Sequence, residues 1–141
     1  MADTIIQIAG KSIKVIDQGD GSFAFALGAT ARSTMTAIIA SGASLSGVVD
    51  LGDNVIVALS MPSAWTTAVL SFQSSYDGVT YQELKDEYDA LLSYNPLVAS
   101  NRAVEPQHFL GWRYIKVRSG TAAVPVNQTA ERVITLITRP L

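Results

Sequence analysis

The sequence predicts an all-β protein, in which an N-terminal β-hairpin arm is followed by an antiparallel β-sandwich or jelly roll. Val, Ile and Thr are abundant in the chain, whereas Lys and Glu, which helices usually expose, are few. Short alternating or fully apolar runs recur between turn signals rich in Gly, Asn, Asp and Pro. Strand patterns at this spacing are typical of a sandwich or jelly roll.

Residues 1–31 are expected to form the hairpin arm. The alternating runs 13–17 and 23–27 flank a turn sequence at 18–21. One face of the hairpin is strongly apolar and is made by Phe23, Phe25 and Leu27. Because two strands alone are marginal in water, this face is expected to cover the main domain or a partner. The small, polar segment 28–33 is interpreted as a linker, so the sandwich comprises residues 32–141.

The sandwich strands are expected at residues 35–39, 43–49, 54–60, 67–74, 80–84, 112–118 and 131–138. Within 67–74, Ala68, Leu70 and Phe72 alternate with residues pointing the other way, which predicts one core face. The continuous apolar runs 55–59 and 133–137 suit central strands covered on both faces.

The window 81–94 has two interpretations. Leu84, Tyr88, Leu91 and Leu92 recur at helical spacing, and Lys85 is placed to pair with Asp89 four residues on, which favours a short helix. The alternative is a strand, an acidic loop and a second strand.

Composition excludes several classes of function. The net charge is -2 and the pI is about 5.2, so no general attraction for nucleic acid or anionic lipid is expected. Cysteine is absent and His108 is the single histidine, which removes thiol nucleophiles and thiolate zinc sites. The N-terminus lacks the pattern of a signal peptide and no run is long enough to cross a bilayer, so we expect a soluble protein made in the cytoplasm.

Catalytic motifs are also missing from the pattern. The nearest approach to the G-x-S-x-G nucleophile motif, residues 42–46, ends in Ser46 instead of glycine. His108 is interpreted as a structural loop residue. The acids crowded between Asp77 and Asp89 lack the calcium-loop spacing, so a solvated turn is favoured over a metal site. The sequence therefore predicts a protein that is not an enzyme and holds no cofactor or metal.

The expected strand 112–118 is the most informative segment for binding. By strand parity Arg113, Ile115 and Val117 share a core face. The opposite face would carry an aromatic and basic strip of Trp112, Tyr114, Lys116 and Arg118. Such a strip suits sugar stacking or the carboxylates of a partner, but it equally suits packing at the edge of the sandwich.

Several stretches resemble known proteins. Residues 13–25 (IKVIDQGDGSFAF) resemble the V-x-D-N-G-D-G-T-Y opening found in many tailed-bacteriophage virion proteins. Residues 72–81 (FQSSYDGVTY), 109–120 and 125–128 resemble a family of small phage head and tail accessory proteins. The same S-x-D-G-x-x-Y and R-Y-I-K-V pattern is similar to discoidin-like jelly rolls that bind carbohydrate. Residues 86–103 depart from the family pattern, because they are longer and more acidic.

The resemblance implies a non-enzymatic virion structural protein on the capsid surface. Such a protein would decorate and stabilise the shell, as a cement protein does, by binding across subunits of the major capsid protein of the parent phage. A homo-oligomer is expected, since virion parts follow the symmetry of their site. The alternative is a glycan- or receptor-binding module of a tail fibre or baseplate, with Trp112 and Tyr114 stacking on sugar. The partner-interface candidates are Phe23, Phe25 and Leu27 in the arm, followed by Trp112, Tyr114 and Arg118.

Overall fold

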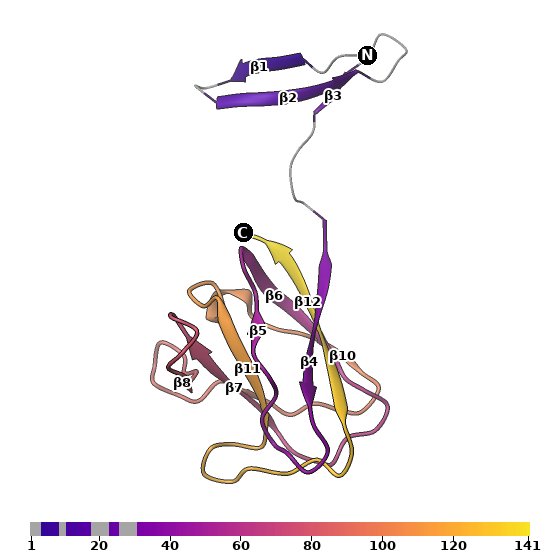
Figure 1. Cartoon of the computed structure of the whole chain (residues 1–141), viewed down its shortest axis with the longest axis vertical. Helices are drawn as coiled ribbons and strands as arrows, with labels where there is room; N and C mark the ends of the chain where they lie inside the picture. Colours follow the sequence, from indigo (N-terminus) through magenta and orange to yellow (C-terminus); the bar gives the residue numbers. More distant parts are fainter. Residues whose placement is uncertain (1–3, 9–10, 18–22, 26–30) are drawn as a thin grey trace. The chain divides into compact units, whose positions relative to one another are not determined.

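The structure is a computed structural model that describes residues 4–8, 11–17, 23–25 and 31–141. The chain forms two compact units, Met1–Thr30 and Ala31–Leu141 (Figure 1). Each unit is described by itself.

The N-terminal unit is a three-stranded antiparallel sheet. Its strands are β1 (Thr4–Ile8), β2 (Lys11–Asp17) and β3 (Phe23–Phe25), in the order β1-β2-β3. Val15 at the centre pairs with Thr4 on one side and with Phe25 on the other. The predicted hairpin is therefore confirmed in β2 and β3, and β1 is an additional strand whose consecutive isoleucines hide the alternation.

Parts of that prediction lie outside the described residues. They are the turn 18–21, Leu27, the linker residues 28–30 and the side chains of Phe23 and Phe25.

The second unit is a sandwich of two antiparallel sheets (Figure 1). Its strands are β4 (Ser33–Ile39), β5 (Val49–Asp50), β6 (Asn54–Ser60), β7 (Leu70–Ser75), β8 (Gln82–Glu83), β9 (Ser93–Tyr94), β10 (Asn101–Ala103), β11 (Tyr114–Ser119) and β12 (Arg132–Pro140). A single 3-10 turn, η1 (Pro106–His108), precedes β11. One sheet has the order β10-β6-β12-β4; the other has the order β5-β11-β7-β8, with β9 also pairing with β7.

The connections are those of a jelly roll, as the sequence predicts. The chain changes sheet between β4 and β5, between β5 and β6, and between β6 and β7. It remains in the second sheet through β8 and β9, then alternates again through β10, β11 and β12. The first and last strands of the sandwich, β4 and β12, are therefore neighbours, and all seven residues of β4 from Ser33 to Ile39 pair with β12.

The core lies between the two sheets. Its largest fully buried side chains include Phe72, Phe109, Ile56, Leu59 and Leu136. The ring of Phe72 meets that of Phe109 edge-to-face, with centroids 5.2 Å apart. Edge-to-face packing suits the ring quadrupoles and holds Phe109, the residue that follows η1, against β7 of the second sheet.

The strand predicted at 54–60 is confirmed, and that at 43–49 is wrong except at its end. There the chain forms only an isolated bridge at Leu45 before β5 begins at Val49. Ser46 explains the difference, because its hydroxyl accepts the backbone N–H of Val117 at 2.9 Å. A side chain replaces a strand carbonyl at this point, so no continuous ladder forms.

The window 81–94 adopts strand, loop and strand, not the helix. A bridge between Lys85 and Leu91 closes a hairpin-like loop after β8, and β9 follows. Asp86 Oδ1 accepts the backbone N–H groups of Tyr88 and Ala90, both at 2.9 Å. A carboxylate that binds its own loop in this way offers the backbone an alternative to a helix. In the part of the chain that the structure describes, no helix has the length and hydropathy needed to span a membrane.

Candidate functional site

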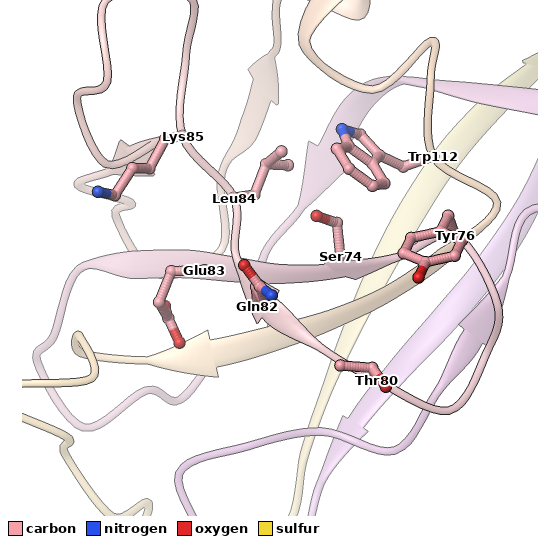
Figure 2. Close-up of a pocket in the computed structure, with 8 residues that line it drawn as sticks. All are labelled: Ser74, Tyr76, Thr80, Gln82, Glu83, Leu84, Lys85 and Trp112. Atoms are coloured by element: carbon pink, nitrogen blue, oxygen red, sulfur yellow. The ribbon is translucent and has the colours of Figure 1, made fainter.

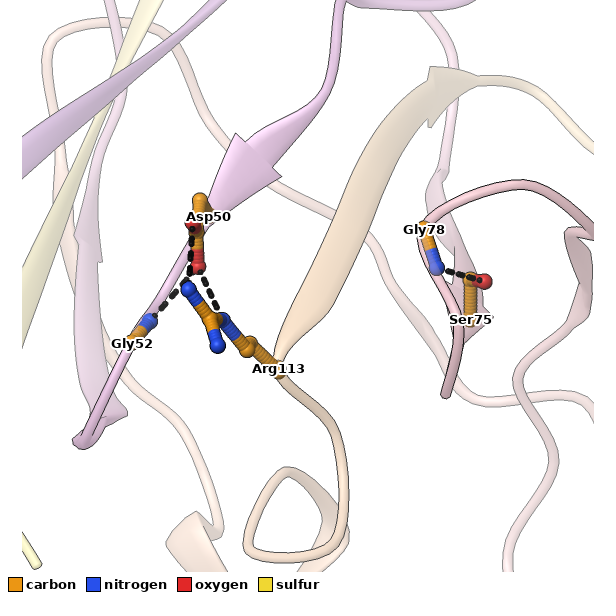
Figure 3. Close-up of polar contacts among 5 residues, drawn as sticks. All are labelled: Asp50, Gly52, Ser75, Gly78 and Arg113. Carbon is orange, nitrogen blue, oxygen red and sulfur yellow. Dashed lines mark hydrogen bonds and ion pairs between the residues drawn. The ribbon is translucent and has the colours of Figure 1, made fainter.

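The turn between β7 and β8 is fixed by two side chains, Ser75 and Asp77. The Ser75 hydroxyl accepts the backbone N–H of Gly78 at 2.9 Å (Figure 3) and donates to Asp77 Oδ1 at 2.9 Å. Asp77 Oδ1 also accepts the backbone N–H groups of Thr80 at 2.9 Å and Val79 at 2.8 Å. These donors, that of Thr80 foremost, lower the pKa of Asp77 below its usual value. The turn is therefore internally satisfied without a ligand.

A pocket of about 320 Å³ opens beside this turn (Figure 2). It is lined by Ser74, Tyr76, Thr80, Gln82, Glu83, Leu84, Lys85 and Trp112. Ser74 and Gln82 are cross-strand partners, so they share the sheet face that Leu84 also joins. Ser74, Leu84 and Trp112 lie on one side of β7 in Figure 2, while the carboxylate of Glu83 lies on the other. The pocket thus combines two aromatic rings with hydroxyl and amide groups.

Strand parity holds within β11 but not before it. Ile115 and Val117 are fully buried, and Tyr114 faces the opposite side of the sheet. Arg113 was expected on the core face, and this is wrong because its side chain is 58% exposed. Trp112 was expected beside Tyr114, and this is also wrong. The strand begins only at Tyr114, and Trp112, in the preceding turn, lies in the pocket.

The basic residues of the expected strip are paired within the molecule. Arg118 forms an ion pair with Glu83, and these side chains are 12% and 24% exposed. Glu83 Oε1 also accepts a hydrogen bond from Gln73 Nε2 at 3.1 Å. Lys116 places its Nζ 4.2 Å from the ring centroid of Tyr81. Arg118 therefore links β11 to β8 through its ion pair with Glu83.

A second ion pair joins β5 to the start of β11. Arg113 Nε donates to Asp50 Oδ1 at 2.9 Å and Nη2 donates to Oδ2 at 3.2 Å (Figure 3). The backbone N–H of Gly52 also donates to Oδ1 at 2.9 Å. Arg113 is the main cause of the lowered pKa of Asp50. Both side chains are about half exposed, so this pair is an ordinary surface clamp.

The acidic window and His108 show local structural roles. Asp89 binds Lys85 at 3.1 Å, and Asp86 organises its own loop. His108 Nε2 lies 3.7 Å from Glu87 Oε2, and its Nδ1 has no hydrogen-bond partner in the described part of the chain. No group of three potential metal ligands occurs among residues 4–8, 11–17, 23–25 and 31–141.

The outer face of the four-stranded sheet carries no charged residue over its centre. Cross-strand pairs in β4 and β12 place Ile38 opposite Val133 and Thr36 opposite Thr135. The face consists of Thr34, Thr36, Ile38, Ala58, Ser60, Asn101, Ala103, Val133, Thr135 and Ile137. Ile38 is 46% exposed and Val133 is 40% exposed. We call this set the uncharged face; Arg132 and Arg139 stand at the two ends of β12.

No family model, curated protein or solved structure matches this chain in the comparisons.

Neither the pocket nor the uncharged face is evident from the sequence pattern. Tyr76 stood within a motif and Gln82 within the ambiguous window 81–94, but only the pairing of β7 with β8 brings them beside Trp112. The uncharged face is assembled from four strands that are far apart in the sequence. Its signal was the occurrence of uncharged Thr, Ile and Val at every second position of residues 34–38 and 133–137.

Proposed function

We propose that this protein is a non-enzymatic structural component of a tailed-bacteriophage virion, which decorates the capsid and stabilises it by binding across shell subunits. The uncharged face carries the proposal. Protein interfaces are depleted of charge at their centre, and a sheet face of mainly Thr, Ile, Val and Ala loses little free energy on desolvation.

The edge of this face supports the same role. β4 is the last strand of its sheet, and among the described residues it pairs only with β12. Natural sheets usually protect such an edge with Lys, Pro or a covering segment. Apart from its ends, β4 carries Thr34, Thr36 and Ile38 outward and no charge. An edge of this composition is suited to a permanent protein contact.

The fold class and the N-terminal unit agree with the proposal. Jelly rolls occur in viral shells and in lectins, which is an analogy at the level of fold. In the sequence, the N-terminal unit Met1–Thr30 precedes β4, the edge strand of the uncharged face. A partner that bound both the N-terminal unit and the uncharged face would bury a larger area than a partner that bound one of them. A protein that binds the assembled shell, and not its free subunits, stabilises the shell.

Copy number in the purified particle tests the proposal. Quantitative mass spectrometry of the parent phage should give a ratio to the major capsid protein near one to one, or another simple lattice fraction. A handful of copies per particle would place the chain on a tail or fibre and overturn the proposal.

Reconstitution on shells that lack the protein tests the uncharged face. We expect Thr36→Lys or Val133→Lys to reduce binding at least tenfold, because each would bury an unpaired ammonium group. The matched control is Val79→Lys, since Val79 is 81% exposed on the turn of the other sheet. Equal binding by the Val133 and Val79 variants would remove this face from the interface.

The arm is tested in the same assay. Phe23→Ala with Phe25→Ala is expected to weaken shell binding while the sandwich stays folded. Unchanged binding would remove the arm from the mechanism.

The alternative, a glycan- or receptor-binding module, stays a prediction. Its expected sugar-stacking face joined Trp112 to Tyr114, and these residues lie in different places. A sugar contact at Trp112 would need partners other than Tyr114.

A further inference from the structure

The pocket beside Trp112 has the composition of a small-ligand site. Its volume of about 320 Å³ lies at the lower end of the range for such sites. Trp112 is half-buried and packs partly against the core, which holds its ring in place. Leu84 in the floor is 3% exposed and Ser74 is 5% exposed. The side chains of Ser74, Leu84 and Trp112 converge in Figure 2.

The second aromatic ring, Tyr76, is held out from the fold by a rigid turn. Tyr76 is 81% exposed, although a tyrosine ring of this kind usually buries its apolar faces. The hydrogen bonds of Ser75 and Asp77 fix the backbone on its C-terminal side, and Gly78 has a φ of +76°. A ring on a fixed turn loses little entropy when a ligand covers it.

Each of the two charged groups in the wall has an ion-pair partner within the molecule. Glu83 is paired with Arg118, and Lys85 with Asp89 at 3.1 Å. The neutral polar groups of the lining are the hydroxyls of Ser74, Tyr76 and Thr80 and the amide of Gln82, which between them donate and accept hydrogen bonds. The ammonium group of Lys85 already has a carboxylate partner, which makes it a weaker anchor for an anionic ligand, whereas the neutral hydroxyl groups of a ligand find both donors and acceptors in the lining.

We propose that this pocket binds a neutral sugar residue. The apolar C–H face of the sugar ring packs against Trp112 and Tyr76, and its hydroxyl groups bond to Ser74 and Gln82. The site is independent of the uncharged face, which lies on the other sheet, and it does not depend on the proposed function.

Titration of the full-length protein with neutral monosaccharides, followed by nuclear magnetic resonance, tests the site. The probes are the methyl glycosides of glucose, galactose and mannose together with N-acetylglucosamine, and sialic acid serves as the charged comparison. The chain has two tryptophans, and the second, Trp65, does not line the pocket. Its indole N–H donates a hydrogen bond of 3.2 Å to the carbonyl of Ala68. We expect at least one neutral sugar to shift the indole signal of Trp112 and leave that of Trp65 unmoved.

Two tyrosine variants provide matched controls. Tyr76→Ala should weaken sugar binding at least tenfold, while Tyr88→Ala should change it less than twofold. Tyr88 is equally exposed, at 83%, but lies outside the pocket. Both residues are at the surface, so neither variant is expected to unfold.

The proposal fails if no neutral sugar shifts the Trp112 signal at millimolar concentration. It also fails if sialic acid binds more tightly than the neutral sugars, or if the two tyrosine variants lose binding equally.

Discussion

Gln128 and Thr66 bind each other through two reciprocal hydrogen bonds. The backbone N–H of Thr66 donates to Gln128 Oε1 at 2.8 Å, and Gln128 Nε2 donates to the carbonyl of Thr66 at 3.0 Å. Gln128 Nε2 also donates a hydrogen bond to Ser119 Oγ at 2.7 Å, and Gln128 Oε1 accepts one from Arg132 Nε at 3.1 Å. Gln128 is fully buried, so one side chain replaces a strand partner for the loop that precedes β7.

Gln128→Ala should therefore destabilise the sandwich by about 2–4 kcal/mol, because it leaves several buried polar groups without partners. Chemical denaturation followed by tryptophan fluorescence measures the change. The control is Asn127→Ala at the exposed neighbouring position, which should stay within about 0.5 kcal/mol of the parent. A similar effect of both variants would contradict the role of the buried amide.

Gly120→Ala should destabilise the sandwich by at least about 2 kcal/mol. Gly120 has a φ of +85°, and a Cβ at this position would collide with the backbone oxygen of Val124. Backbone atoms cannot move aside as a side-chain end does. Gly111→Ala is the control, since nothing lies within 4 Å of a Cβ built there. The midpoints of urea unfolding compare the two, and equal midpoints would disprove the backbone clash.

Asp77 should make stability depend on pH in the acid range. Its pKa is lowered in the folded protein, so its contribution is complete above the unfolded pKa of roughly 3.9 and is lost as the pH falls through the folded value. Asp77→Asn keeps the Oδ1 acceptor but does not titrate.

The difference in free energy of unfolding between the parent and Asp77→Asn should therefore be constant at neutral pH and should shrink in favour of the variant below roughly pH 4. Urea unfolding at several pH values measures it. A difference that does not change with pH would show that the carboxylate charge contributes nothing to the turn.

Arg118 and Glu83 should be energetically coupled. Both side chains are mostly buried, so removing either partner leaves the other charge desolvated. A double-mutant cycle with Arg118→Ala and Glu83→Ala should give a coupling energy of roughly 1–3 kcal/mol. The exposed pair of Asp50 and Arg113 is the comparison, with a coupling below about 1 kcal/mol. If the effects of the two single variants simply add, the two side chains are not coupled, and the ion pair does not stabilise the sheet.

The local pattern predicted the parts of the fold that depend on side-chain alternation. The strand 54–60 and the buried pair Ile115 and Val117 follow directly from apolar spacing. So does the all-β class, because a chain rich in β-branched residues disfavours helices. The window 81–94 remained ambiguous, since Leu84 and Leu92 satisfy helical spacing as well as two short strands.

Tertiary structure alone decided the surfaces that matter for binding. Trp112 leaves the strand because β11 begins after it, and the pairing of β7 with β8 then brings it beside Gln82. Arg118 is withdrawn from solvent by Glu83, and four distant strands assemble the uncharged face. Residue spacing along a strand determines which side chains share a face, and it follows from backbone geometry. Which strands become neighbours depends on the free energy of the whole packed core, and no short segment contains that information.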